Sequence, residues 1–312
     1  MKLKLQSKKA LSALLCAVPM LISAQTIIIN ETNFPDKNFR ACLLEEEFGK
    51  DGVITPEEII ETTDIVVVMR NISNLKGIEY FTALTHLDCS YNQLTSLNVS
   101  QNTALTYLDC SSNQLTSLDI SQNKRLETFR CHSNQLTSLN LSQNTKLTSL
   151  NCSLNQLTSL DVSQNTALNG LYCGENLLTS LNVSQNTALT DLNCHSNQIQ
   201  GKGLDNLIKS LPQDTIGQER KLYIYNSDGK DDNICTKSQV AMAKERGWTP
   251  YHFDGMWWNE YEGMDEADGI AQPTIEIIDE NAPIYNLAGQ KVESLQGKKG
   301  IYIVDGKKVF IK

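Results

Sequence analysis

Apolar and polar positions along the middle of the chain follow a pattern that recurs every 21 residues. From Leu84 it runs Leu-x-x-Leu-x-Cys-x-x-Asn-x-Leu. The recurring cysteines are Cys89, Cys110, Cys131, Cys152, Cys173 and Cys194, and the recurring asparagines are Asn92, Asn113, Asn134, Asn155, Asn176 and Asn197. Two columns in one register indicate stacked repeats in place of an ordinary globular core.

The unit is the pattern of a leucine-rich repeat with cysteine at its third apolar position. A weaker unit, one residue longer, runs from Ile65 through Val67, Ile72 and Leu75, so we expect about seven coils. The predicted fold is a leucine-rich-repeat solenoid, of the α/β class by family but mostly β here. Its coils stack as a parallel sheet at the ~4.8 Å spacing of neighbouring strands.

Each unit also repeats itself internally. Leu84-x-x-Leu87-x-Cys89 is followed by Leu94-x-x-Leu97-x-Val99. This echo predicts a second row of parallel strands in the second half of each coil, because no amphipathic helical stripe fits so short a segment. Irregular or short 3₁₀ structure is the alternative for that half.

The two kinds of column predict structural roles. We expect the asparagine column, and a second one that begins at Asn102, to satisfy buried turn backbone with both ends of the side-chain amide. Cysteines on adjacent coils should lie about 4.8 Å apart at Cβ, whereas a disulfide needs about 3.8 Å, so buried free thiols are expected. Whether Cys42 and Cys235 pair stays open.

The segments outside the repeats differ in composition. Lysines precede an apolar run from Ala10 to Ala24, which predicts an export signal cleaved after Ala24, and no later stretch approaches the ~20 apolar residues of a membrane span. The expected organisation is a signal peptide (1–24), a helical N-terminal cap (25–63), the repeats (64–202), an α/β C-terminal cap (203–256), an acidic linker (257–272) and a small β module (273–312).

The N-terminal cap contains a degenerate EF-hand-like stretch from Glu47 to Glu58. Asp51 and Glu58 are its only strong oxygen ligands, so they are weak calcium candidates and a helical cap is favoured. No other metal site and no cofactor is expected.

Charge and residue spacing exclude other classes of function. The net charge of −9 and pI near 5.0 provide no basic patch for nucleic acid. His132 and His195 share a row but lie three coils apart, roughly 14 Å at the coil spacing, which is too far to share a metal. With no distinctive nucleophile and no phosphate loop, we expect no catalytic residues.

Variation between repeats concentrates on the first strand of each coil, while the other positions recur nearly unchanged. Tyrosine and arginine among serine and asparagine are the residue types that dominate interface energetics. The contact candidates are Tyr91, Tyr107, Arg130, His132, Tyr172, Glu175 and His195. Neutral drift at exposed positions is the alternative explanation.

The repeats, the opening from Phe34 to Phe39 and the segment Cys235-Thr-Lys-Ser-Gln239 resemble secreted leucine-rich-repeat proteins of Bacteroidetes, related to internalins. The stretches around Tyr285 and Lys299 resemble C-terminal modules that include sorting signals for type nine secretion. The resemblance implies a secreted or cell-surface protein that binds a host or bacterial surface protein in adhesion. It supplies no catalytic residues.

Two other functions stay open. One is a passive surface spacer, in which the exposed positions have no specific partner. The other is polysaccharide binding, which exposed tyrosines favour and the absence of tryptophan from the repeats disfavours.

Overall fold

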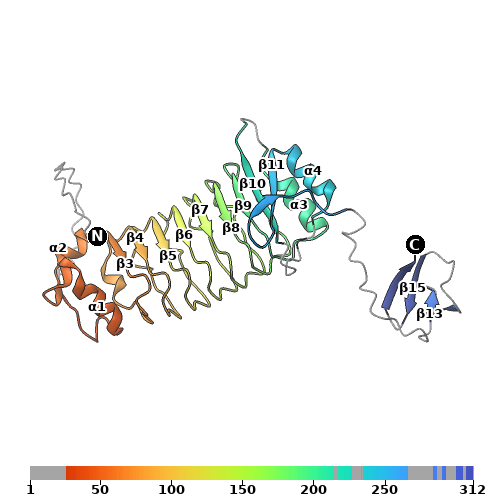
Figure 1. Cartoon of the computed structure of the whole chain (residues 1–312). Helices are drawn as coiled ribbons and strands as arrows, with labels where there is room; N and C mark the ends of the chain where they lie inside the picture. The colour runs from red at the N-terminus through yellow and green to blue at the C-terminus, as the bar shows by residue number, and fades with distance from the viewer. Residues whose placement is uncertain are drawn as a thin grey trace.

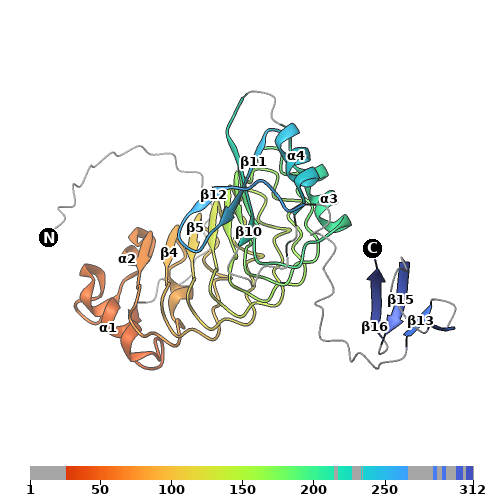
Figure 2. The same cartoon turned by 45° about the vertical axis from the view of Figure 1, so that its right-hand side comes forward.

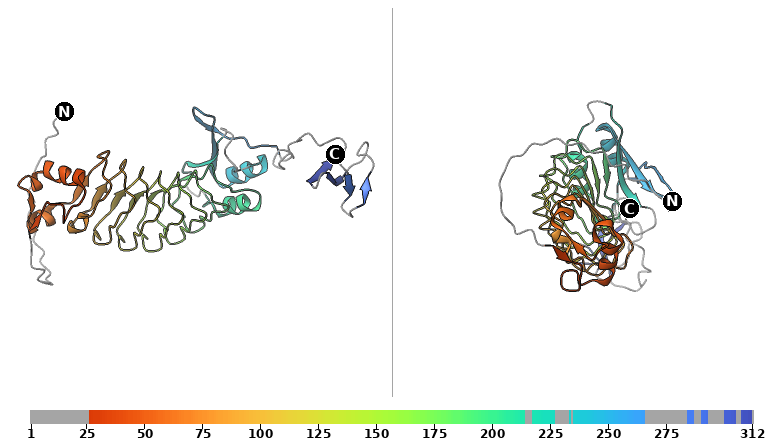
Figure 3. Two further views of the ribbon diagram at one scale, coloured as in Figure 1. Left: turned by 90° about the horizontal axis from the view of Figure 1, so that it is seen from below. Right: turned by 90° about the vertical axis from the view of Figure 1, so that its left-hand side faces the viewer.

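The computed structural model describes residues 26–213, 217–226, 233, 235–265, 284–286, 290–292, 300–304 and 307–311. Its main feature is a ten-stranded sheet in the order β12-β11-β10-β9-β8-β7-β6-β5-β4-β3 (Figure 1). The chain is a leucine-rich-repeat solenoid, as the sequence predicts. Viewed from below, its coils stack one after another between two capping segments (Figure 3).

Seven of the ten strands come from the repeats, one per coil. They are β3 (Asp64–Val66), β4 (His86–Asp88), β5 (Tyr107–Asp109), β6 (Thr128–Arg130), β7 (Ser149–Asn151), β8 (Gly170–Tyr172) and β9 (Asp191–Asn193). All pair in parallel with equivalent residues side by side, as Leu87 beside Leu108 shows. The central residue of each strand, leucine in five of them, Ile65 in β3 and Phe129 in β6, points into the core, and its two neighbours point outward, so the sheet has one free face.

The expected second row of strands is wrong. The second half of the coil beginning at Leu84 contains two successive turns, closed by hydrogen bonds from Asn102 N to Val99 O (3.0 Å) and from Leu105 N to Asn102 O (3.2 Å). These turns use the carbonyls within the coil, so a ladder to the next coil cannot form. A side-chain amide bridges the coils there, because Asn123 Nδ2 donates to Val99 O (2.9 Å) and Asn102 O (3.0 Å).

The first asparagine column behaves as predicted. In the middle of the solenoid, Asn134 Oδ1 accepts from Leu115 N (2.9 Å) and Nδ2 donates to Cys110 O (3.0 Å) and Cys131 O (3.1 Å). The second column uses one end of the amide. Among the described residues, Oδ1 is buried without a hydrogen-bond partner at Asn102, Asn123, Asn144, Asn165 and Asn186.

The six column cysteines are buried free thiols, as predicted. Each repeats the same packing as a small apolar side chain, and Cys89 Sγ lies 3.4 Å from Asp109 O of the next coil. Burial raises the pKa of Cys152 to about 12. Cys42 and Cys235 are free as well, and they lie in different caps.

The N-terminal cap is helical. It contains β1 (Ile27–Ile28), α1 (Lys37–Glu45), the 3₁₀ helix η1 (Glu47–Gly49), β2 (Val53–Ile54) and α2 (Pro56–Glu61), and a second 3₁₀ helix, η2 (Ile78–Tyr80), follows in the first coil. Asp36 caps α1 through Oδ1, and its Oδ2 accepts from Ser73 N and Oγ, both at 2.8 Å. One carboxylate therefore fixes the helix to the first coil.

The C-terminal cap extends the sheet. Its elements are α3 (Lys202–Ser210), β10 (Arg220–Asn226), α4 (Lys237–Glu245), β11 (Trp248–Phe253) and β12 (Trp258–Glu260). β10 and β11 continue the parallel sheet from β9, and β12 adds to its edge in the antiparallel direction. The buried residues of β10 alternate with half-buried ones, as expected for a strand with one covered face.

Residues 258–265 do not form the acidic linker expected from residue 257. Residues 258–260 form β12, and Tyr261 is buried with its hydroxyl donating to Cys235 O (3.2 Å). Aromatic burial fixes this stretch, and two of its acidic groups face lysines of α4: Lys237 with Asp265 at 2.7 Å and Lys244 with Glu262 at 3.9 Å. Residues 266–272 lie outside the described residues.

A small β module follows, as predicted. It comprises β13 (Ile284–Asn286), β14 (Lys291–Val292), β15 (Gly300–Val304) and β16 (Lys307–Ile311), which pair antiparallel in the order β14-β13-β15-β16. The predicted signal peptide and the start of the predicted module, residues 273–283, lie outside the described residues. Within those residues, every helix is too short or too polar to cross a bilayer.

The two asparagine columns should differ in their contribution to stability. Asn134→Ala leaves Leu115 N without its partner and removes hydrogen bonds to three carbonyls, whereas Asn144→Ala removes hydrogen bonds to two carbonyls that each keep a backbone donor. We expect losses in unfolding free energy of about 3 and about 1.5 kcal/mol respectively, measured by urea denaturation. Equal losses would contradict the assignment of Asn134 Oδ1 as the stronger link.

The thiol column predicts alkaline unfolding. Burial raises the pKa of Cys89, Cys110, Cys131, Cys152 and Cys173 in the folded state, while unfolded thiols titrate near pH 8.5. Between about pH 9 and 12 the unfolded chain binds fewer protons, so each thiol should lower stability by about 1.4 kcal/mol per pH unit as pH rises. Circular dichroism should show cooperative unfolding near pH 10 to 11, because five such terms exceed a typical domain stability of about 5–15 kcal/mol.

Replacing two of these thiols tests the cause of the alkaline unfolding. In the variant Cys131→Ala with Cys152→Ala, the dependence of stability on pH above 9 should be shallower, although stability at neutral pH falls. An unchanged slope would show that other groups cause the alkaline unfolding.

Candidate functional site

Two rows of outward side chains cover the free face of the sheet. The first row is His86, Tyr107, Thr128, Ser149, Gly170 and Asp191, and the second is Asp88, Asp109, Arg130, Asn151, Tyr172 and Asn193. Parallel pairing without register shifts places each residue directly beside its equivalent. The variable positions of the repeat therefore form one continuous surface on a nearly invariant frame.

A compact polar cluster occupies the N-terminal half of this surface. The ring of Tyr107 stacks on His86 with centroids 4.1 Å apart, and the guanidinium of Arg130 lies 5.7 Å from the Tyr107 centroid. Arg130 Nη1 donates to Tyr107 Oη (3.2 Å) and lies 3.8 Å from Asp109 Oδ2. Burial, and then the charge of Asp109, raises the pKa of Tyr107, so its hydroxyl stays protonated at neutral pH.

This cluster is preorganised. Tyr107 belongs to β5, and the two side chains that flank its ring, His86 and Arg130, belong to β4 and β6. Three successive coils therefore hold the tyrosine in place. A side chain that is already ordered loses little entropy when a partner binds.

The two histidine candidates lie in a third row, directly after the cysteines. His132 Nδ1 lies 3.2 Å from Ser133 Oγ, and His195 Nδ1 lies 2.9 Å from Ser196 Oγ. Burial lowers the pKa of His132, so this ring is neutral at physiological pH. The structure keeps the two histidines three coils apart and gives them different neighbours.

A fourth row has left-handed backbone. Tyr91 (φ 55°), Leu154 (φ 54°) and Glu175 (φ 53°) are exposed there, Met69 occupies the equivalent position of the first coil, and serines occupy those of the remaining coils. Left-handed backbone costs a residue with a Cβ roughly 1–2 kcal/mol, and glycine or asparagine is the usual occupant. Tyr91 is 56% exposed and Leu154 is 44% exposed, so burial of these side chains offsets little of the backbone strain energy.

The structure adds an aromatic group that the sequence analysis did not assign to this face. Tyr223 of β10 extends the second row beside Asn193, and Tyr251 of β11 follows it. The ring of Trp258 lies 4.9 Å from that of Tyr223 and 5.1 Å from that of His195, as centroid distances. Figure 2 shows β10, β11 and β12 standing beside the strands of the coils.

A sequence signal for this group existed. Residues 220–226 alternate polar or aromatic residues with apolar ones, which predicts a strand with one open face. Pairing of that strand with the last coil is a tertiary feature, so its rings could not be placed beside His195 from sequence.

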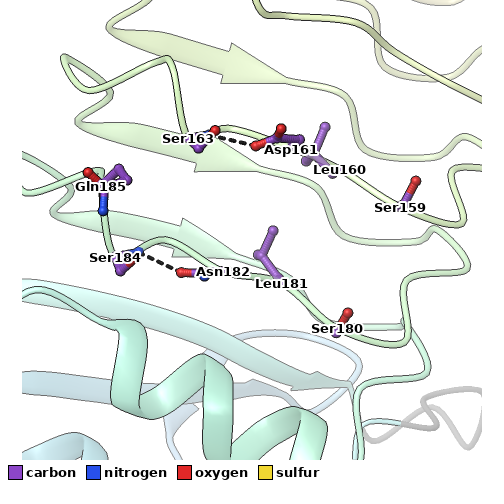
Figure 4. A pocket seen from close by; sticks show the side chains of 9 residues that line it. All are labelled: Ser159, Leu160, Asp161, Ser163, Ser180, Leu181, Asn182, Ser184 and Gln185. Carbon is purple, nitrogen blue, oxygen red and sulfur yellow. Dashed lines mark hydrogen bonds between the residues drawn. The ribbon is translucent and has the colours of Figure 1, made fainter.

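The opposite side of the coils contains a shallow hollow of about 470 Å³ (Figure 4). Asp161 Oδ1 accepts from Ser163 N, and Asn182 Oδ1 accepts from Ser184 N, both at 2.9 Å. A similar hollow lies near the N-terminal cap, where it is lined by Ser96, Leu97 and Asn98. Such hollows are a property of the repeat and mark no specific site.

The weak calcium candidates serve local structure. Asp51 Oδ1 accepts from Val53 N (3.1 Å), and Glu58 Oε2 accepts from Thr55 N (2.7 Å) in the capping box of α2. Across the part of the chain that the structure describes, no three His, Cys, Asp or Glu side chains are grouped as metal ligands.

Comparison with known proteins agrees with this geometry. A family described as leucine-rich repeats in two copies matches residues 82–123. The coils are leucine-rich repeats. A stretch of internalin J from Listeria monocytogenes serotype 4b is 42% identical over 83 residues, which is 26% of this chain and 9% of that protein. The matched stretch is therefore a small part of that relative.

Two solved structures are similar in outline. The functional domain of InlJ from Listeria monocytogenes, which includes a cysteine ladder, is 25% identical with a TM-score of 0.40, over 74% of this chain and 68% of that chain. Internalin C2 from the same species is 20% identical with a TM-score of 0.43, over 59% of this chain and 94% of that chain.

The left-handed row predicts stabilising substitutions. Leu154→Gly should raise the free energy of unfolding by about 1 kcal/mol, because glycine adopts this backbone without strain. Thr128→Gly, in the regular strand β6, should lower it by about 1 kcal/mol and serves as the control. Urea denaturation measures both, and destabilisation by Leu154→Gly would show that the leucine packs against the coil in solution.

Proposed function

We propose that this protein is an exported binding module that holds a protein partner of a host or bacterial surface on the free face of its sheet. The observation that carries the proposal is the division of each coil into a nearly constant frame and a variable outward strand. The parallel register brings the variable strand positions onto one face. A scaffold of this kind supports recognition by many side chains, each with a fixed position.

The residue types on the face fit protein recognition. Tyr107 and Arg130 are preorganised, Tyr172 lies two coils beyond Arg130 in the same row, and Tyr91 projects from the left-handed row. Tyrosine and arginine are the residues that contribute most at protein interfaces. A strained, exposed tyrosine also supports selection for contact over neutral drift.

Export and surface location belong to this proposal. The apolar segment that ends at Ala24 and the C-terminal module that resembles sorting modules support it. The similarity of the repeats to internalin J supports the assignment as a protein-binding surface module in adhesion. Binding is proposed in place of catalysis because the polar side chains of the cluster at Tyr107 interact with one another.

A pull-down tests the proposal. The mature chain is used as bait for host and bacterial surface extracts, beside a variant with Tyr107→Ala, Arg130→Ala and Tyr172→Ala. We expect the mature chain to retain a specific protein and the variant to bind it at least about tenfold more weakly, because each truncation at an interface centre costs on the order of 1 kcal/mol. Surface plasmon resonance with the purified partner gives the affinities.

A matched control variant distinguishes loss of the binding face from loss of the fold. Thr116→Ala, Thr137→Ala and Thr158→Ala lie in three successive coils on exposed positions away from the strands. This variant should bind as the parent does. Equal retention by all three proteins, or by none, would favour a spacer that has no specific partner on this face.

A further inference from the structure

Six rings gather at the C-terminal end of the sheet face. They belong to Tyr172, His195, Tyr223, Tyr251, Phe253 and Trp258, which we call the aromatic end. Trp258 is the centre, with ring centroids 4.9 Å from Tyr223, 5.1 Å from His195 and 5.4 Å from Phe253. All six side chains are half-buried, so each is held in place and still reaches solvent.

Two glycines of one coil shape this surface. A Cβ at Gly170 would lie 3.2 Å from Tyr172 Cε2 and 3.6 Å from its hydroxyl, so the tyrosine ring rests over the bare backbone. A Cβ at Gly174 would lie 3.0 Å from two atoms of the His195 ring. Equivalent coils have side chains at these positions. The coil of β8 therefore lets both rings lie low across the sheet.

Hydrogen-bonding groups lie between and beside the rings. Asn193 separates Tyr172 from Tyr223 in the second row, and its buried Oδ1 lacks a hydrogen-bond partner among the described residues. Asp191 lies in the first row of the same strand, and Glu260 pairs with Tyr251 across β11 and β12. The nearby cation is balanced, because Lys221 lies 3.4 Å from Glu219.

The composition of this surface distinguishes between kinds of ligand. The outward residues of β8 to β10 are Gly170, Tyr172, Asp191, Asn193, Lys221, Tyr223 and Tyr225, and none of them is aliphatic. The apolar contact is therefore supplied by ring faces with polar groups between them. Sugar rings require this combination, since their C–H faces stack on aromatic rings and their hydroxyls bond carboxylates and amides.

The charge of the surface and the distance between its rings restrict the class of ligand further. Asp191 and Glu260 would repel an acidic polymer, so an acidic ligand is excluded. Tyr172 and Tyr223 stand two strands apart, about 9.6 Å at the usual strand spacing, which exceeds one sugar ring. We propose that the aromatic end is a binding site for a neutral polysaccharide, separate from the polar cluster at Tyr107. This revises the expectation from sequence, because Trp258 joins the face although the repeats contain no tryptophan.

Affinity electrophoresis tests the site with defined probes. The mature protein is run on native gels that contain laminarin, hydroxyethylcellulose, xyloglucan or yeast mannan, and on gels that contain alginate or polygalacturonate. At least one neutral polymer should retard the protein, and the two acidic polymers should not. The variant Tyr223→Ala with Trp258→Ala should bind the retarding polymer at least tenfold more weakly.

Four further variants serve as controls. Tyr223→Phe keeps the ring and should keep most of the retardation, and Tyr223→Ala alone should lose it if the double variant fails to fold. Trp257→Ala removes a tryptophan that is 68% exposed in the β11–β12 connection, outside the aromatic end, and should bind as the parent does. Tyr107→Ala with Arg130→Ala should leave retardation unchanged while it weakens capture of a protein partner.

Each other outcome overturns the proposal. Absence of retardation by all four neutral polymers would do so, as would retardation that survives in the folded double variant or is matched by the acidic polymers. If the double variant loses a protein partner while no glycan binds, the aromatic end is part of the protein interface, and the protein-binding function stands without a polysaccharide site.

Discussion

The buried side-chain amide is the interaction on which the solenoid depends. A coil of 21 residues contains only one three-residue strand, so most of its backbone turns inside the stack, away from strand pairing. In each coil after the first, one asparagine accepts from the backbone of its neighbour and donates to carbonyls of both coils, as Asn134 does. Buried backbone groups need partners, and here a side chain supplies what a continuous ladder would supply elsewhere.

The need to pair buried backbone groups divides the positions of the repeat into a nearly constant interior frame and a variable surface. The asparagines, the cysteines and the inward leucines are fixed because a change at any of them leaves a cavity or an unpaired group in the stack. The outward strand side chains lie outside the stacked core, so they vary at low cost to the fold. The same physics that makes the coils alike therefore concentrates variation on one side, where the polar cluster and the aromatic end lie.

The sequence was most informative at positions where the same residue type recurs from repeat to repeat. Cys89 and Asn92 recur in one register, and the strand row, the thiol column and the outward rows follow from that register. The second half of the coil was misjudged because Leu94 and Leu97 suggest a strand, whereas the turns closed by Asn102 depend on hydrogen bonds that spacing does not reveal. Trp258 was misplaced for a related reason: acidic neighbours suggested a linker, while its partial burial depends on the rings of His195 after β9, Tyr223 of β10 and Phe253 of β11.

The similarity of successive coils, whose stacking surfaces match, has a consequence for how the protein evolves. Each coil presents the same carbonyls and the same asparagine to the next, so an additional copy of 21 residues would fit anywhere in the stack. Unequal recombination between such similar repeats would lengthen or shorten the face by whole coils without disturbing either cap. The breadth of what the protein recognises can thus change in steps by gene duplication, faster than point substitution could reshape a globular surface.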